Sequence, residues 1–222
     1  MTDIENTVIN SLSFYEKLND SQKRAIADNI SVKRLKQGYN VHSSSEECTG
    51  LIIVRHGELR VYMLSEDGRE ITLYRLFEND VCVLSASCVL DSITFDVFID
   101  AEEDSEVLIV NSKTVNEIAN ENIYAKCFML KQATERFSEV MWVMQQILFF
   151  KADRRVAIFL IDEMNKTKSA SLNLTHDKIA KYIGSAREVV SRILKYFERD
   201  KIVKLQRGGV EILDKAALMK MI

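Results

Sequence analysis

The chain contains no proline, three histidines and no hydrophobic run long enough to cross a membrane. Its longest apolar stretch, Val140 to Phe150, is interrupted by Gln145 and Gln146, whereas a membrane-spanning helix needs roughly 20 apolar residues. We therefore expect no membrane span. The missing proline has no functional meaning that the sequence reveals.

Cysteine is sparse, and its spacing matches no metal or redox motif. The four cysteines are Cys48, Cys82, Cys88 and Cys127, and none belongs to a C-x-x-C pair. The first ten residues carry acidic and polar side chains, where a secretory signal needs a basic start followed by an apolar run. A cytoplasmic location is expected on this basis, and free, mostly buried thiols are the usual state of cysteine there.

The composition is that of an ordinary soluble protein, but its charge is unevenly distributed. Hydrophobic residues make up 47% and charged residues 28% of the 222 residues, which is enough for two modest domains. Residues 1–150 hold 14 Lys and Arg against 24 Asp and Glu, whereas residues 151–222 hold 16 against 9. The net charges are therefore −10 and +7. A basic module suits binding to nucleic-acid phosphates, although a solvated basic face without a partner has the same charge.

Two patterns divide the first 110 residues. Residues 11–30 have apolar side chains at helical spacing, which predicts one or two short helices. Residues 32–110 hold short runs rich in Val, Ile, Leu, Tyr and Phe between turn signals, which predicts a compact antiparallel β domain. The expected strands cover residues 50–54, 58–64, 70–77, 96–101 and 106–111, and the clearest hairpin connects Leu64 to Glu70.

The pattern turns helical after Ser112 and remains so to about residue 150, an interval without Gly or Pro. One seam repeats at intervals of three and four residues, which is typical of a coiled coil. A second flank, formed by Met141, Trp142 and Leu148, is suited to packing on the β domain. The alternative is a core helix of a monomer, but few surfaces within one chain would bury both flanks, so we expect dimerisation. The seam residues are Leu130, Ala133, Phe137, Val140, Met144 and Ile147.

The C-terminal third has the pattern of a winged helix-turn-helix, with three helices followed by two short strands around a Gly-rich turn, Arg207-Gly208-Gly209. The expected helices cover residues 155–164, 175–183 and 186–199, and the expected strands cover residues 202–205 and 210–213. Residues 165–173, rich in Ser, Thr and Lys, are expected to form a polar loop.

The helix pair within residues 175–199 carries outward side chains suited to reading DNA. Thr175 is placed to cap the first helix, and Gly184 provides the flexible residue of the turn. The second helix presents side chains that match base edges in the major groove, with Arg suited to guanine and Glu to cytosine. These outward residues are Arg187, Glu188, Ser191, Arg192 and Lys195. Two plainer interpretations remain, a capping box of Ser185 with Glu188 and an ion pair of Glu188 with Arg192.

The order of β domain, long helix and winged helix-turn-helix, with Arg187-Glu188-x-x-Ser191-Arg192 on the second helix, resembles the Crp/Fnr family of bacterial transcription regulators over essentially the whole chain. The resemblance implies an α+β fold with an N-terminal antiparallel β-roll of the cyclic-nucleotide-binding type, a dimerisation helix and a DNA-binding domain. The corresponding domains are residues 1–120, 121–150 and 151–222. The implied partners are double-stranded DNA, a second copy of the chain and, for an activator, RNA polymerase; no enzymatic activity is implied.

The resemblance also suggests roles for single residues. In the family, the positions matching Glu188 and Arg192 contact bases of a TGA core, the position matching Arg187 reads an adjoining G, and Ser191 matches the serine of the Fnr branch. A palindrome of TGA-type half-sites is therefore implied, with both GTGA and TTGA open.

Phosphate contacts are expected at four further positions by the same resemblance and by outward charge. Thr175 and His176 fall where family members contact phosphates, while Ala186 replaces a residue whose hydroxyl often helps. The candidate phosphate contacts are Thr175, His176, Lys178 and Lys195.

Residues 81–97 correspond to the segment that holds ribose and cyclic phosphate in nucleotide-binding members of the family. That segment there contains Gly-Glu and Arg-Ser or Arg-Thr, whereas here it contains no Gly, Glu or Arg and carries Asp91 and Asp96. A phosphate would be repelled, so cAMP is not expected. An iron–sulfur cluster is not expected because no cysteine precedes Cys48, and haem is not expected because Ser85 stands at the histidine position of the haem branch.

An apolar pocket for an unidentified small ligand remains, between the β domain and the long helix. A thiol sensor at Cys82 and Cys88 is the alternative, but packing of these side chains as small hydrophobes is favoured. The candidate pocket residues are Cys82, Leu84, Ser85, Cys88, Phe95, Phe137 and Met141.

Three other functions compete with an effector-controlled regulator. A DNA-binding protein without an effector has the same helix-turn-helix. A cupin-type metal enzyme needs clustered histidines, whereas His42, His56 and His176 are scattered along the chain, so no metal site is expected. A dimerisation scaffold leaves the outward Arg and Glu side chains of the second helix unexplained. Steep, salt-dependent binding to palindromic DNA separates a regulator from an enzyme.

Overall fold

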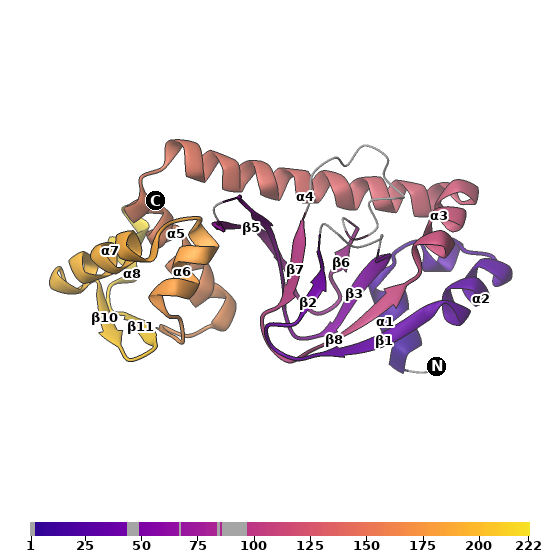
Figure 1. The fold of residues 1–222 in the computed structure, drawn as a ribbon, viewed down its shortest axis with the longest axis horizontal. Helices are drawn as coiled ribbons and strands as arrows, with labels where there is room; N and C mark the ends of the chain where they lie inside the picture. Colours follow the sequence, from indigo (N-terminus) through magenta and orange to yellow (C-terminus); the bar gives the residue numbers. More distant parts are fainter. Residues whose placement is uncertain (1–2, 44–48, 67, 84, 86–96) are drawn as a thin grey trace. The chain divides into compact units, whose positions relative to one another are not determined.

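The computed structural model describes residues 3–43, 49–66, 68–83, 85 and 97–222, and the chain divides into two compact units (Figure 1). The first unit comprises Met1–Leu64 and Leu73–Val140, and the second comprises Ser65–Thr72 and Met141–Ile222. Antiparallel sheets, a long helix and C-terminal helices with a small sheet confirm the expected α+β fold class.

The first unit is built on two four-stranded sheets, with strand orders β1-β8-β3-β6 and β2-β7-β4-β5. The expected strands are confirmed, with ends shifted by one or two residues, and β1, β2 and β6 are additional. The last strand of the second sheet, β5, begins in the residues assigned to the second unit. The strands are β1 (Ile30–Leu35), β2 (Asn40–His42), β3 (Leu51–His56), β4 (Leu59–Leu64), β5 (Glu70–Leu76), β6 (Val81–Cys82), β7 (Phe98–Ala101) and β8 (Ser105–Val110).

Strand β3 is buried on both faces, and this explains its unbroken apolar run. Ile52 and Val54 join side chains from both sheets in one core. Leu51 and Ile53 instead pack beneath the N-terminal helices and the start of the long helix. The helices of this region are α1 (Asp3–Ser11), the 3-10 helix η1 (Tyr15–Lys17), α2 (Asp20–Asp28), α3 (Ser112–Glu121) and α4 (Ile123–Phe149).

The helical stretch expected over residues 112–150 consists of two helices, α3 and α4, which meet at Asn122. This residue has extended backbone angles, and its side-chain oxygen accepts hydrogen bonds from the Tyr124 and Ala125 backbone N–H groups at 3.0 and 3.2 Å. Asn122 thereby ends α3 and caps α4, a role for which asparagine is well suited.

The second unit contains the expected helix-turn-helix and wing. Its core joins all three expected helices through fully buried side chains, among them Leu160, Ile179, Val190 and Phe197. The elements are α5 (Ala152–Thr167), β9 (Ser171–Leu172), α6 (His176–Ile183), α7 (Arg187–Arg199), β10 (Val203–Gln206), β11 (Gly209–Ile212) and α8 (Lys215–Met219).

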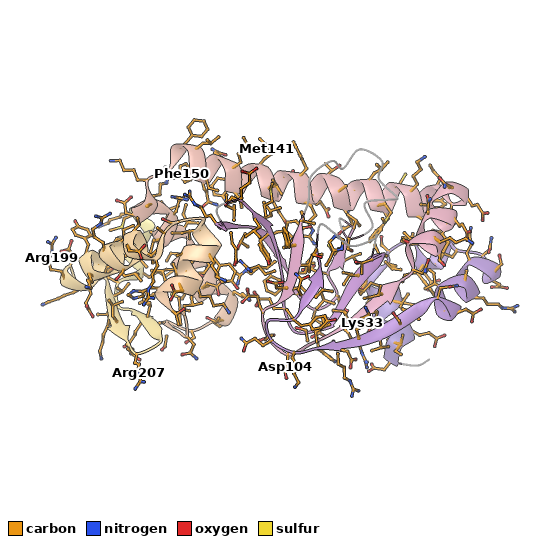
Figure 2. All side chains as sticks on the ribbon, viewed as in Figure 1. Lys33, Asp104, Met141, Phe150, Arg199 and Arg207 are labelled. Atoms are coloured by element: carbon orange, nitrogen blue, oxygen red, sulfur yellow. The ribbon has the colours of Figure 1, made fainter. Side chains whose placement is uncertain are left out.

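The wing is larger than expected. Strand β9 lies inside the expected polar loop and pairs with β11, so that the sheet order is β10-β11-β9. Arg207 lies at the turn between β10 and β11 (Figure 2). Within the described part of the chain, no helix has the length and apolar character needed to span a membrane.

Replacing Phe197 with Ala tests the core of the second unit. The Phe197 side chain is completely buried, and truncating such a ring costs about 3–5 kcal/mol of unfolding free energy because it leaves a cavity. The neighbouring Tyr196 is 48% exposed, so Tyr196→Ala is the matched control and should cost about 1 kcal/mol or less. Urea denaturation followed by circular dichroism measures both, and equal losses would contradict the assigned core.

Candidate nucleic-acid interface

Helix α6 and the turn after it are fixed by local hydrogen bonds. The Thr175 side chain accepts a hydrogen bond from the Lys178 backbone N–H at 3.1 Å, which confirms the expected cap. Gly184 ends the helix in the left-handed conformation, with φ 60° and ψ 47°, and its N–H donates to the Ala180 carbonyl. The turn therefore sets where α7 begins relative to α6.

Helix α7 buries one face and exposes the other. Val190, Leu194 and Phe197 are fully buried in the core of the second unit. The other face lines an open groove with a volume of about 410 Å³. The residues that line it are Arg187, Glu188, Ser191, Arg192 and Lys195, the same five expected to face outward.

Most of the groove's polar side chains are not engaged by the protein. Arg187 lies 3.4 Å from the Asp177 carboxylate, an exposed ion pair. Within the described ranges, Glu188, Ser191, Arg192 and Lys195 make no side-chain hydrogen bond or ion pair. Their polar groups are therefore available to a ligand.

The two plainer interpretations of α7 do not match this geometry. Ala186, not Ser185, occupies the N-cap, and no side-chain hydrogen bond caps the helix. The Glu188–Arg192 ion pair is also absent among the residues whose positions are described.

The candidate phosphate contacts lie on both helices of the pair. Thr175 is exposed at the start of α6, where free backbone N–H groups and the helix dipole favour anions. His176 and Lys178 are half-buried, and the Lys178 ammonium lies 5.8 Å from the centre of the Tyr182 ring. Lys195 lines the groove itself.

Helix α4 exposes a long apolar seam with alternating four- and three-residue spacing. Phe137 and Met144 are 63% and 49% exposed, whereas Ala133 and Val140, which were expected in the seam, pack against buried cores of the first unit. Ile147 is half-buried. The exposed seam comprises Ile123, Cys127, Leu130, Thr134, Phe137, Met141, Met144 and Leu148.

The candidate effector residues do not form one cluster in the described structure. Cys82 and Ser85 are buried, and the Ser85 hydroxyl hydrogen bonds to the Gly50 and Cys82 carbonyl oxygens at 2.7 and 3.0 Å. Phe137 and Met141 lie on the exposed seam of α4. Leu84, Cys88 and Phe95 lie outside the described residues.

Sequence reasoning missed Arg136, which is buried on the inner face of α4 at 8% exposure. Its Nη1 group donates to both carboxylate oxygens of Glu139 at 2.9 Å, and its guanidinium lies 4.9 Å from the centre of the Tyr74 ring. Burial alone lowers the pKa of Arg136, but the Glu139 carboxylate reverses this effect and raises the pKa. The sequence contained one signal for this role: Arg136 is a basic residue between Ala133 and Val140, which both face the core.

Tyr74 continues this arrangement into the core between the sheets. Its hydroxyl lies 3.9 Å from the Cys82 sulfur, and burial raises its pKa well above the ordinary value for tyrosine. Tyr74 therefore stays neutral in the folded protein at ordinary pH, as a packed core residue does.

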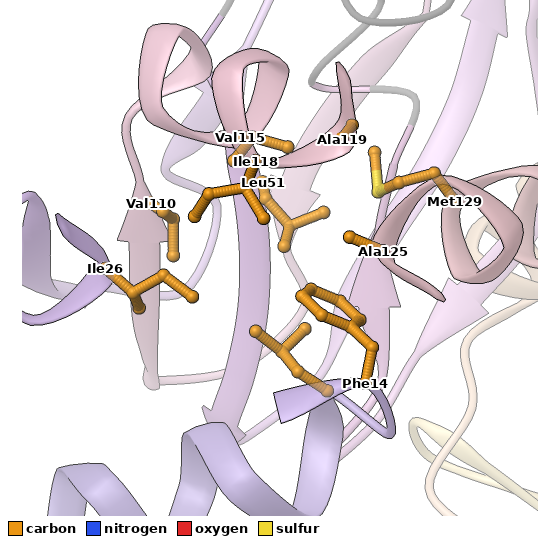
Figure 3. A pocket seen from close by; sticks show the side chains of 10 residues that line it. Phe14, Ile26, Leu51, Val110, Val115, Ile118, Ala119, Ala125 and Met129 are labelled. Carbon is orange, nitrogen blue, oxygen red and sulfur yellow. The ribbon is translucent and has the colours of Figure 1, made fainter. Parts of the chain in front are cut away.

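A separate apolar cavity lies beneath the N-terminal helices of the first unit (Figure 3). Phe14, Ile26, Leu51 and Met129 are among its lining side chains. Its volume of about 10 Å³ has room for about one water molecule. It is therefore a packing defect, not an effector site.

The three histidines have unrelated surroundings. The buried His42 shares a hydrogen bond of 2.8 Å with the Thr49 hydroxyl, and the exposed His56 lies 3.6 Å from Glu78. In the described ranges, no three His, Cys, Asp or Glu side chains gather in a way that could hold a metal ion.

Comparison with family models assigns the two units to known domain types. Residues 32–122 match the cyclic nucleotide-binding domain, and residues 154–221 match the Crp-like helix-turn-helix domain. The second match contains every residue that lines the groove.

Individual proteins agree with these matches. A solved structure described as a transcriptional regulator of the Crp/Fnr family from Eubacterium rectale is 41% identical, with a TM-score of 0.91, covering 96% of this chain and 98% of that one. The fumarate and nitrate reduction regulatory protein of Vibrio cholerae is 24% identical over 92% of this chain and 84% of its own. The cyclic AMP receptor protein of Thermus thermophilus is 23% identical over 82% and 83%.

Replacing Gly184 tests the turn that positions α7. A Cβ atom at this position would meet Ile147 Cδ1 at 3.4 Å, an ordinary contact, so the expected cost is conformational. We expect Gly184→Ala to lower the unfolding free energy by about 1–2 kcal/mol, the cost of a left-handed conformation. Gly184→Asn is the matched control, because asparagine tolerates this conformation better. Equal losses in urea denaturation would point to crowding instead of backbone strain.

Proposed function

The chain belongs to the Crp/Fnr family of transcription regulators, and from this membership we propose that it binds palindromic DNA as a homodimer under the control of a small effector. Family members regulate transcription and are not enzymes, so the cupin-type alternative is set aside. DNA is bound by the helix-turn-helix of the second unit.

The groove along α7 is the observation that carries the proposal. It gathers two guanidinium groups, a carboxylate, a hydroxyl and an ammonium on one exposed helix face. Arginine donates to guanine O6 and N7, and glutamate accepts from cytosine N4. Glu188 and Arg192 are the proposed readers of a TGA-type half-site, with Lys195 and the start of α6 binding flanking phosphates.

Arg187 and Ser191 decide the base outside the TGA core in this proposal. The Arg187 guanidinium is already 3.4 Å from Asp177, an exposed pair that contributes about 1 kcal/mol or less and is easily exchanged for a base. The proposal therefore allows both GTGA and TTGA half-sites. In the palindrome, the two half-sites lie about one helical turn apart.

Dimerisation through α4 is the second part of the proposal. The exposed seam repeats at the spacing of a heptad over the length of this 27-residue helix. Large apolar side chains such as Phe137 and Leu148, at 63% and 60% exposure, favour burial against the same seam of a second copy. Two recognition helices would then face two half-sites of a palindrome.

We further propose that the effector is neither cAMP nor a haem or iron–sulfur cofactor. Residues 81–97 contain no Arg for a cyclic phosphate, and the guanidinium of Arg136 on α4 is bound by Glu139. The buried Ser85 hydroxyl already bonds two carbonyl groups. A small ligand near Cys82 and α4 fits better than a phosphodiester, and RNA polymerase is the further partner if the protein activates transcription.

Arg192→Ala tests base reading. We expect specific binding to weaken by about 1–3 kcal/mol and one position of the selected site to lose its preference, because a bidentate base contact disappears. Lys178→Ala is the control, since losing a phosphate contact weakens all sequences alike. Selection of bound fragments from a random DNA pool measures the preference. An unchanged preference with Arg192→Ala rules out this reader.

Phe137→Glu tests the seam. A carboxylate at the centre of the seam would be buried without a partner in the dimer. We therefore expect the dissociation constant of the dimer to rise by about tenfold or more. Ser138→Glu adds the same charge at an exposed neighbour outside the seam and should leave association unchanged. Sedimentation equilibrium measures both variants, and equal behaviour would remove the seam from the interface.

Cys127 provides a second readout of the same interface. It is free, exposed and part of the seam, and equivalent core positions of a parallel helix pair face each other. Mild oxidation with copper phenanthroline should therefore give a covalent species of twice the 25.5 kDa chain mass. The Cys127→Ser chain should not form it. A cross-link that persists in Cys127→Ser would assign the contact to another cysteine.

A further inference from the structure

We propose that a cavity in the second unit, beneath the turn of the helix-turn-helix, binds a small monocarboxylate through Arg155. The cavity lies between the C-terminal part of α4, α5 and the end of α6, all within this unit. Its volume is about 80 Å³, several times the roughly 10–15 Å³ that one water molecule requires.

The Arg155 guanidinium on the cavity wall lacks a compensating charge. Its Nη1 group donates to the Ile183 carbonyl oxygen at 2.6 Å, and its Nε atom is buried without a hydrogen-bond partner. No carboxylate pairs with Arg155 in the described structure, and burial lowers its pKa. An anion in the cavity would supply both the missing acceptor and the missing charge.

The other walls define the class of anion. A carboxylate matches the planar N–H groups of a guanidinium. The Asp162 carboxylate also lines the cavity and disfavours a dianion such as phosphate, because like charges repel. Val143, Ile147 and Ile158 provide apolar surface for a short aliphatic body, and the volume limits that body to a few carbon atoms.

A structural role alone is the competing explanation. Arg155 binds the last carbonyl of α6, directly before Gly184, and a cation there stabilises a helix C-terminus without any ligand. That role predicts lower stability when Arg155 is replaced, but no binding of a carboxylate to the native protein. Ligand binding therefore separates the two explanations.

The test follows the Arg155 Nε–H resonance by nuclear magnetic resonance in the full chain labelled with ¹⁵N-arginine. Sodium propionate is titrated at constant ionic strength, and we expect a saturable shift with a dissociation constant near the millimolar range, about that of one charged contact with modest apolar burial. Val143→Phe places a ring in the cavity while leaving Arg155 itself unchanged, and it should weaken propionate binding about tenfold or more. Arg154→Gln is the matched control, because Arg154 packs over the Phe150 ring and does not line the cavity.

Three results would overturn the inference. The first is a chemical shift of the Arg155 Nε–H resonance that never saturates with propionate. The second is an equal shift in Val143→Phe, provided that the circular dichroism of this variant matches that of the native chain. The third is an equal shift with phosphate, because that would indicate general attraction of anions to positive charge. The experiment contains no DNA, so its failure leaves the proposed function untouched, and a failure of DNA binding leaves the cavity untouched.

Discussion

Helix α4 has two apolar faces, and the described part of one chain covers only one of them. Its inner face, with Phe128, Met129 and Val140, packs against the cores of the first unit. The other face keeps Phe137 and Leu148 exposed over a helix of 27 residues. Leaving such a stripe in water is unfavourable in proportion to its apolar area. The proposed two-fold pairing of this helix would remove the stripe from water and would also duplicate the DNA-binding unit, so one physical constraint would account for both the proposed dimer and a palindromic target.

Helix α7 also separates an apolar face from a polar face within a single helix. In α7, buried Val190, Leu194 and Phe197 fix the orientation of the helix. Of the polar side chains on its outer face, only Arg187 is paired within the described residues, with Asp177. The Thr175 side chain and the Gly184 backbone N–H set the two ends of α6 through hydrogen bonds to backbone groups. Stability therefore depends on the apolar and capping residues, while Glu188 and Arg192 remain available to DNA.

Local patterns in the sequence were enough to predict most elements, and the failures have physical causes. Strands β3, β4 and β5 alternate or run apolar, but β1 exposes Ser31 to Arg34 and has little hydrophobic signal. Strand β9 has two residues, and pairing with β11 defines it, which no local pattern reveals. The boundary between α3 and α4 depends on the Asn122 side chain. Asparagine is favoured at helix N-caps and disfavoured in helix interiors, but it carries no apolar signal that marks the boundary. The exposed polar face of α7 was predictable because amphipathic spacing and charge agreed there, whereas the proposed effector site depends on contacts between distant segments.

The seam shows how far periodicity reaches. A three- and four-residue repeat fits several stripes of one helix, and the stripe chosen from sequence mixed the two faces of α4: Ala133 and Val140 face the chain's own core, while Met141 and Leu148 belong to the exposed stripe.

Buried guanidinium groups pose the same problem at the level of single residues. Arg136 is neutralised by Glu139 and packed on Tyr74, so it joins α4 to the β core, whereas Arg155 has a carbonyl partner, no carboxylate partner within the described residues, and a cavity beside it. Because a buried charge is stable only with compensation, the surroundings and not the residue type distinguish a structural arginine from one that binds a ligand.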